Sequence, residues 1–81
     1  MWDGTRVDLL GEDYAWEVDW SHKWAEAIGQ SLYYAEMTGR KPGVILLTRD
    51  KATDRRYLYR CKIVCTKFGI RLAIEDASVL I

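Results

Sequence analysis

Residues 14–20 read Tyr-Ala-Trp-Glu-Val-Asp-Trp, and this stretch decides the fold that we expect. Bulky apolar residues alternate along it with Ala15, Glu17 and Asp19, and a period of two is typical of a β-strand. One face of this strand is therefore strongly apolar, whereas the opposite face carries two carboxylates. The apolar face consists of Tyr14, Trp16, Val18 and Trp20.

The segment before this strand predicts an antiparallel partner for it. Asp3-Gly4 is a turn signal, and the strand-like run Thr5–Leu10 follows it directly. If Gly11–Tyr14 forms a four-residue loop, Asp8 lies opposite Glu17 on the neighbouring strand. Directly opposed residues of antiparallel strands share one face of the sheet, with Cβ atoms ~5 Å apart.

Two like charges at this separation repel each other, and a divalent cation between them would remove the repulsion. Mg²⁺ prefers carboxylate oxygens together with water and phosphate oxygens. Asp19 lies on the same face as Glu17 and offers a third oxygen donor, so Asp8, Glu17 and Asp19 are the expected metal ligands. The alternative is an acidic face that is simply exposed to solvent.

A helix is predicted from His22 to Thr38, with Ser21 as its N-cap and Gly39 as its stop. Its expected core stripe consists of Trp24, Ile28, Leu32 and Ala35. At 100° per residue, three polar side chains share another edge of this helix. They are Lys23, Gln30 and Tyr34. A solvated edge of the helix is the alternative interpretation.

The remainder of the chain predicts a strand at Gly43–Thr48, a helix from Thr53 or Asp54 to Phe68, and a strand at Ile70–Ile74. The order is thus strand, strand, helix, strand, helix, strand. This order indicates a small α/β sandwich in which two helices accompany a mixed sheet of about four strands. We expect one domain over residues 1–81, with a core at about 3–75 and a tail at 76–81.

Composition excludes several classes of protein. The chain has 81 residues, 49% of them hydrophobic, with four Trp and five Tyr, which is incompatible with a disordered tail. No apolar run approaches the ~20 residues that span a bilayer, and no signal peptide is expected, so the cytoplasm is the default location. Cys61, Cys65 and the single His22 do not form a zinc-binding pattern.

Charge is divided unevenly along the chain, although twelve Lys and Arg balance twelve Asp and Glu. Residues 1–38 hold eight acids and two bases, whereas residues 39–81 hold ten bases and four acids. Such asymmetry can signal a nucleic-acid or membrane surface, but charge alone favours two solvated faces that neutralise each other across the fold. The residues expected to contact a phosphate backbone are Arg49, Lys51, Arg55, Arg56, Arg60 and Lys67.

The ordered set Asp8, then Glu17-Val18-Asp19, then Gln30-Ser31-Leu32-Tyr33-Tyr34 resembles the PD-(D/E)XK nuclease superfamily. More narrowly, it is similar to the branch with a downstream Q-x-x-x-Y motif, in its small phage and bacterial members. The resemblance covers roughly residues 3–75. It implies a small restriction-endonuclease-like sandwich that lacks the family's N-terminal helix and most of its first strand.

The resemblance also implies roles for individual residues. Asp8 and Glu17 would bind Mg²⁺ or Mn²⁺, and Gln30 and Tyr34 would support the site and the nucleic-acid backbone. The family's lysine is expected two residues after the acid, where this chain has Asp19. Lys23, which enters from the helix, is the expected replacement, and it completes the catalytic set of Asp8, Glu17, Lys23, Gln30 and Tyr34.

The expected function is therefore Mg²⁺-dependent hydrolysis of DNA, by an endonuclease or exonuclease with resolvase-like preference for branched substrates. The alternative is a catalytically silent member of the fold that binds DNA or dimerises. A third hypothesis is an interaction domain that docks on a larger protein. A homodimer is expected, because a second chain would cover the exposed sheet edge and the apolar face. No membrane and no small-molecule cofactor are expected.

Overall fold

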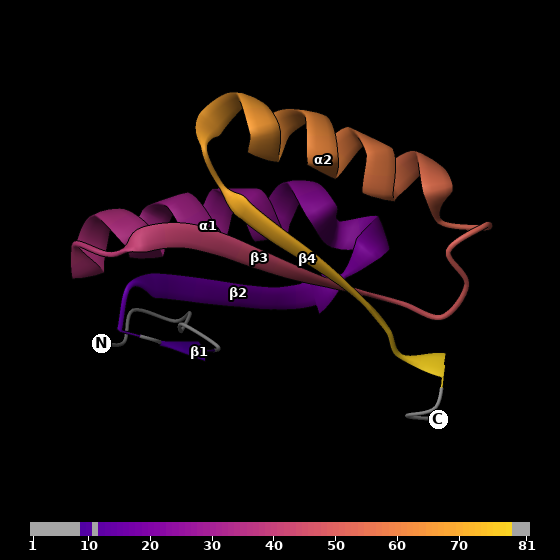
Figure 1. The fold of residues 1–81 in the computed structure, drawn as a ribbon, viewed down its shortest axis with the longest axis horizontal. Coiled ribbons are helices and arrows are strands. Elements are labelled where there is room, and N and C mark those ends of the chain that lie inside the picture. The colour runs from indigo at the N-terminus through magenta and orange to yellow at the C-terminus, as the bar shows by residue number, and fades with distance from the viewer. Residues whose placement is uncertain (1–8, 11, 79–81) are drawn as a thin grey trace.

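The structure is a computed structural model that describes residues 9–10 and 12–78. Figure 1 shows the order and arrangement of the elements. These elements are β1 (Leu9–Leu10), β2 (Tyr14–Trp20), a short 3-10 helix η1 (Ser21–Lys23), α1 (Trp24–Thr38), β3 (Lys41–Thr48), α2 (Arg55–Phe68) and β4 (Arg71–Asp76). The strand at 14–20 and the helix that ends at Phe68 lie where the sequence predicts them.

The predicted mixed sheet of about four strands is wrong. The body of the observed sheet consists of three parallel strands in the order β2, β3, β4, rather than a mixed sheet of about four strands in a restriction-endonuclease-like sandwich. Within the described residues, antiparallel pairing is limited to the two residues of β1 at the outer edge of β2. The reason is connectivity, because each helix after β2 is a crossover that returns the chain parallel to the preceding strand.

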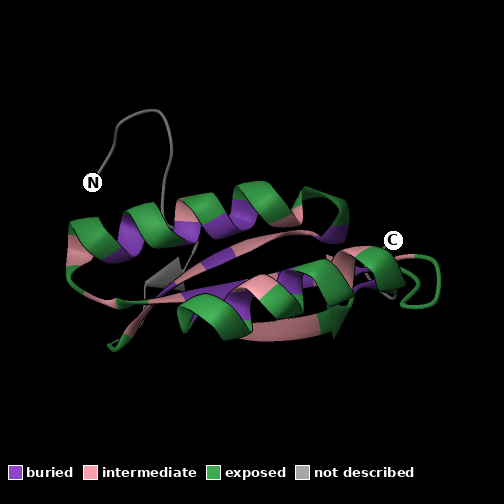
Figure 2. Ribbon diagram, turned by 90° about the horizontal axis from the view of Figure 1, so that it is seen from above, coloured by how far each residue is buried: buried purple, intermediate pink, exposed green. Residues whose placement is uncertain are grey.

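Both helices cover the same face of the sheet, and they lie side by side when viewed from above (Figure 2). The strands follow one another in a single direction across the sheet, and both right-handed crossovers therefore fall on one side. Gly39 and Gly69 end the two helices in the left-handed conformation, with φ of 70° and 68°. No helix within residues 12–78 is long and apolar enough to cross a membrane.

The core lies between this sheet face and the helices. It is built from Val44 and Leu46 of β3, together with buried residues of both helices. These buried helical residues are Ala27, Ile28, Cys61 and Cys65. Leu32, which the sequence predicts in the core stripe, is instead 42% exposed, and Tyr34 is buried in its place. The stripe is rotated toward residues 27, 31 and 34 because α1 packs on β2 and β3 through that edge.

The other face of the sheet carries no helix and presents the aromatic side of β2. Tyr14 and Trp16 stack with ring centroids 5.3 Å apart, and the guanidinium of Arg71 lies 5.5 Å from the Tyr14 ring. Trp16 lies flat over Gly43 of β3, where an added Cβ would stand 2.5 Å from ring atom Cε3. The absence of a side chain at Gly43 thus leaves the space that the indole ring occupies on the sheet surface.

Candidate functional site

The acidic face of β2 is covered by helices and is not an open surface. Glu17 pairs with Val44 in the parallel register, so its side chain points toward the helices, and it is only 4% exposed. Asp19 is half-buried on the same face, and its Oδ1 accepts the backbone N–H of Trp20 at 2.8 Å. Asp8, the predicted partner of Glu17, lies outside the described residues.

The three polar residues that the sequence predicts along one edge of α1 differ in their exposure to solvent. Tyr34 is buried at 1% exposure, Gln30 is half-buried one turn earlier, and Lys23 is exposed at the end of η1. The Tyr34 ring packs edge-on against Tyr33, with centroids 5.4 Å apart. Its hydroxyl group is buried and has no hydrogen-bond partner among the described residues. A buried polar atom in that condition is uncommon in proteins.

The described residues do not by themselves fit a metal centre. Within residues 12–78 no group of three or more His, Cys, Asp or Glu side chains is arranged to hold a metal ion. Glu17 and Asp19 supply two carboxylates on one face, and one oxygen of Asp19 is already used by the backbone. These two carboxylates alone do not support a hydrolytic step through a metal.

The basic residues gather on α2, which is the most highly charged element of the described structure. Five bases and no acid occur between Arg55 and Phe68, and all five are exposed. They are Arg55, Arg56, Arg60, Lys62 and Lys67. By contrast, the neighbouring α1 contains two acids, Glu26 and Glu36, and no base. The two adjacent helices thus carry opposite charge, with two of the eight acids of residues 1–38 on α1 and five of the ten bases of residues 39–81 on α2.

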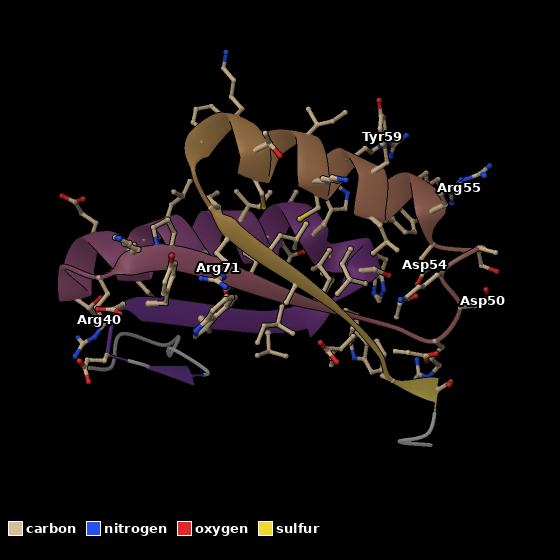
Figure 3. All side chains as sticks on the ribbon, in the orientation of Figure 1. Arg40, Asp50, Asp54, Arg55, Tyr59 and Arg71 are labelled. Atoms are coloured by element: carbon tan, nitrogen blue, oxygen red, sulfur yellow. The ribbon has the colours of Figure 1, made fainter. Side chains whose placement is uncertain are left out.

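Aromatic side chains interleave with these bases. Tyr59 is 65% exposed and projects from α2 together with Arg55, as Figure 3 shows. Arg56 is held by its neighbour Tyr57, whose hydroxyl accepts from Nη2 at 3.0 Å while the guanidinium lies 4.9 Å from the ring centroid. Exposed arginines beside aromatic rings are suited to nucleic acid, because the rings stack on bases and the guanidinium groups bind phosphates.

Two other predicted contacts, Arg49 and Lys51, lie in the loop between β3 and α2 rather than on the helix. Lys51 is exposed. Arg49 is exposed too, and its guanidinium lies 4.1 Å from the centre of the Trp20 ring at the end of β2. It therefore belongs to the end of the sheet and not to the basic surface of α2.

A polar cluster at the carboxyl ends of the strands fixes the start of α2, and sequence reasoning missed it. Ser21 and Thr48 are almost fully buried, and each donates a hydrogen bond of 2.6 Å to Oδ2 of Asp54. These two bonds lower the pKa of the Asp54 carboxyl. Asp50 caps the same loop by accepting the Ala52 N–H. Figure 3 shows Asp50 and Asp54 together at this end of the molecule.

The sequence contains a local signal for two members of this cluster but none for their meeting in space. The sequence identifies Ser21 and Asp54 as helix caps, but Ser21 is the first residue of η1, and Asp54, although it is the N-cap residue of α2, makes no side-chain cap hydrogen bond. Their partner in space, Thr48, lies at the end of a strand between them. Only the parallel arrangement of β2 and β3 brings the three residues together.

Searches of protein-family models, curated proteins and solved structures found no match to this chain.

Proposed function

We propose that this domain binds the phosphate backbone of DNA through the exposed face of α2. The observation that supports this function is the set of five bases and no acid on one helix, all of them exposed. Arg56, Arg60 and Lys67 form one stripe on that helix, at about 0°, 40° and 20°. A DNA partner would place the protein inside the cell.

The acidic charge of the neighbouring helix α1 determines which path a bound DNA backbone would follow. α1 lies beside α2 on the same side of the sheet but carries only acids. DNA lying across both helices would meet repulsion over α1, so the backbone is expected to follow α2. Phosphate contacts of this kind contribute affinity and orientation but do not read bases, which favours recognition of structure over sequence.

The test is a salt titration of binding to a short fluorescent duplex. Replacing Arg56, Arg60 and Lys67 together by Gln should weaken binding at least tenfold at low salt. The slope of log K against log salt should become shallower by roughly 0.9 for each phosphate contact that is lost. Lys41→Gln, an exposed base at the start of β3, is the matched control and should leave the slope unchanged. Equal binding by the triple variant and the native protein would contradict the proposal.

We also propose a second function, metal-dependent hydrolysis of DNA, in which the Q-x-x-x-Y resemblance assigns roles to Gln30 and Tyr34. The specific observation in its favour is the buried Tyr34 hydroxyl, which has no hydrogen-bond partner among the described residues. Glu17 faces the same interior from β2. The metal would be Mg²⁺ or Mn²⁺, with Asp8 and Glu17 as its ligands.

Cleavage of supercoiled, linear and branched DNA with either metal tests this second function. Asp8→Asn and Glu17→Gln should each abolish cleavage, whereas Asp13→Asn, an exposed acid outside the proposed set, should not. Lys23→Ala tests the expected replacement lysine. Absence of cleavage by the native protein would leave DNA binding as the function and contradict hydrolysis.

A further inference from the structure

The outer edge of β4 combines an open strand edge with an apolar cavity. β4 is the last strand of the sheet, and within residues 9–10 and 12–78 no strand pairs with its outer side. A cavity of about 360 Å³ lies between β4 and α2. It is lined by Lys62, Cys65, Thr66, Ile70, Leu72 and Ile74. An open edge presents unpaired backbone N–H and C=O groups, which can pair with another strand.

The two faces of β4 differ in chemistry. Leu72 and Ile74 pair in register with Val44 and Leu46, so they point toward the helices and the cavity. Arg71, Ala73 and Glu75 alternate with them and therefore point to the face without helices. The charged residues Arg71 and Glu75 are both exposed.

We infer that a second copy of this chain binds here, with the two β4 strands antiparallel and centred on Ala73. A two-fold axis perpendicular to the sheet keeps the helices of both copies on the same side, so opposed residues have numbers of equal parity. Centring on Ala73 places each Arg71 opposite the partner's Glu75, and each Leu72 opposite the partner's Ile74. Charge thus meets opposite charge on one face, and apolar side chains meet at the cavity on the other.

The neighbouring registers do not share this complementarity. Centring on Ile74 would place Leu72 opposite the partner's Asp76 and Ala73 opposite the partner's Glu75. Centring on Leu72 would place Arg71 opposite the partner's Ala73 and leave Glu75 without a partner in the strand. The sequence of β4 therefore selects one register of self-pairing.

The existing contact of Arg71 is compatible with this dimer. Its guanidinium carbon lies over the Tyr14 ring, 5.5 Å from the ring centroid, in a contact that is not a hydrogen bond. The N–H groups in the guanidinium plane remain able to bind a carboxylate. The pairing also joins two three-stranded parallel sheets into one continuous sheet, which removes the open edge of both copies.

Charge reversal tests the register directly, by sedimentation velocity from micromolar to millimolar concentration. The native protein should form dimers. Arg71→Glu alone places Glu opposite Glu at both ends of the pairing, and Glu75→Arg alone places Arg opposite Arg. Each variant should dimerise roughly tenfold or more weakly than the native chain. Lys41→Glu, which changes an exposed base on β3, is the control and should dimerise normally.

Mixing the two single variants provides the decisive measurement. In the mixed pair every Glu faces an Arg, so Arg71→Glu and Glu75→Arg should form a heterodimer although each alone dimerises much more weakly than the native chain. This recovery also shows that both variants are folded. A monomeric native protein, normal dimers of both variants, or a mixture that stays monomeric would each overturn the inference. DNA binding through α2 is measured separately, so either proposal can fail alone.

Discussion

The hydroxyl of Thr48 donates a hydrogen bond of 2.6 Å to Oδ2 of Asp54, which joins the end of β3 to the start of α2. The same oxygen accepts the hydroxyl of Ser21, so the end of β2 is tied to this point as well. Both hydroxyl groups belong to buried residues, and loss of the carboxylate would leave both O–H donors without an acceptor. The placement of α2 therefore depends on one half-buried carboxylate.

We expect Asp54→Ala to destabilise the domain by about 2 kcal/mol at pH 7, because two buried hydroxyl groups lose their acceptor. The two hydrogen bonds lower the pKa of Asp54 in the folded state. Its stabilising effect is therefore complete above its ordinary pKa of about 4 and is lost as the pH falls through the lower folded value. Urea unfolding at several pH values measures this. The difference between variant and native protein should shrink in acid, and a difference that persists there would contradict the account.

Gly43→Ala should destabilise the domain by about 1–3 kcal/mol, because the new Cβ would stand 2.5 Å from the Trp16 ring. Displacement of the ring should also change tryptophan fluorescence in the folded state. Gly29→Ala is the matched control, since nothing lies within 4 Å of its added Cβ on the exposed side of α1. That control should stabilise the protein by roughly 0.5–1 kcal/mol. Equal stability of the two variants would refute the assigned role of Gly43.

Tyr34→Phe should leave stability nearly unchanged, because the buried hydroxyl has no hydrogen-bond partner among the described residues. Tyr34→Ala should cost about 3–5 kcal/mol through loss of the buried ring. If the hydroxyl serves DNA cleavage, Tyr34→Phe should lower the cleavage rate while the melting temperature stays constant. A large loss of stability in Tyr34→Phe would show that the hydroxyl has a structural partner.

Cys61 and Cys65 should react slowly with alkylating reagents in the native protein. The contact with Cys65 Sγ, 3.7 Å away, and burial both raise the pKa of the Cys61 thiol, so little thiolate forms at Cys61, and for Cys65 the protection comes from burial. Both residues are buried, and their spacing of four in α2 does not suit disulfide geometry. Mass spectrometry after brief alkylation at pH 8 should show unmodified protein in buffer and two modifications in urea. Rapid native modification would contradict the burial of this pair.

Much of the secondary structure followed from local patterns. Alternation predicted β2, and the glycines at 39 and 69 marked the ends of both helices. The hairpin register was also predicted, since Leu10 pairs with Ala15. The core face of α1 was predicted in part, since Ile28 and Ala35 are buried and Trp24 packs against the core, but Leu32 does not belong to it. The contact between α1 and the sheet instead buries Tyr34 and exposes Leu32.

The sequence predicted which residues of the candidate site are charged, but not which of them are exposed to solvent. The exposed basic surface of α2 follows from composition and helical periodicity, which the sequence contains in full. Whether Glu17 faces solvent or the helices depends on the side of the sheet that the crossovers occupy. That side is set by the order of the strands and the right-handedness of the connections, which no local pattern expresses.

The sequence by itself determined which segments are helices and strands, which residues alternate on β2, and which helix carries the positive charge. These properties depend on neighbours within a few positions along the chain. Only the tertiary structure decided that both helices cover one face of the sheet, that Glu17 is buried, and that Ser21, Thr48 and Asp54 meet. Each of these depends on segments that lie far apart in the sequence and come together through packing.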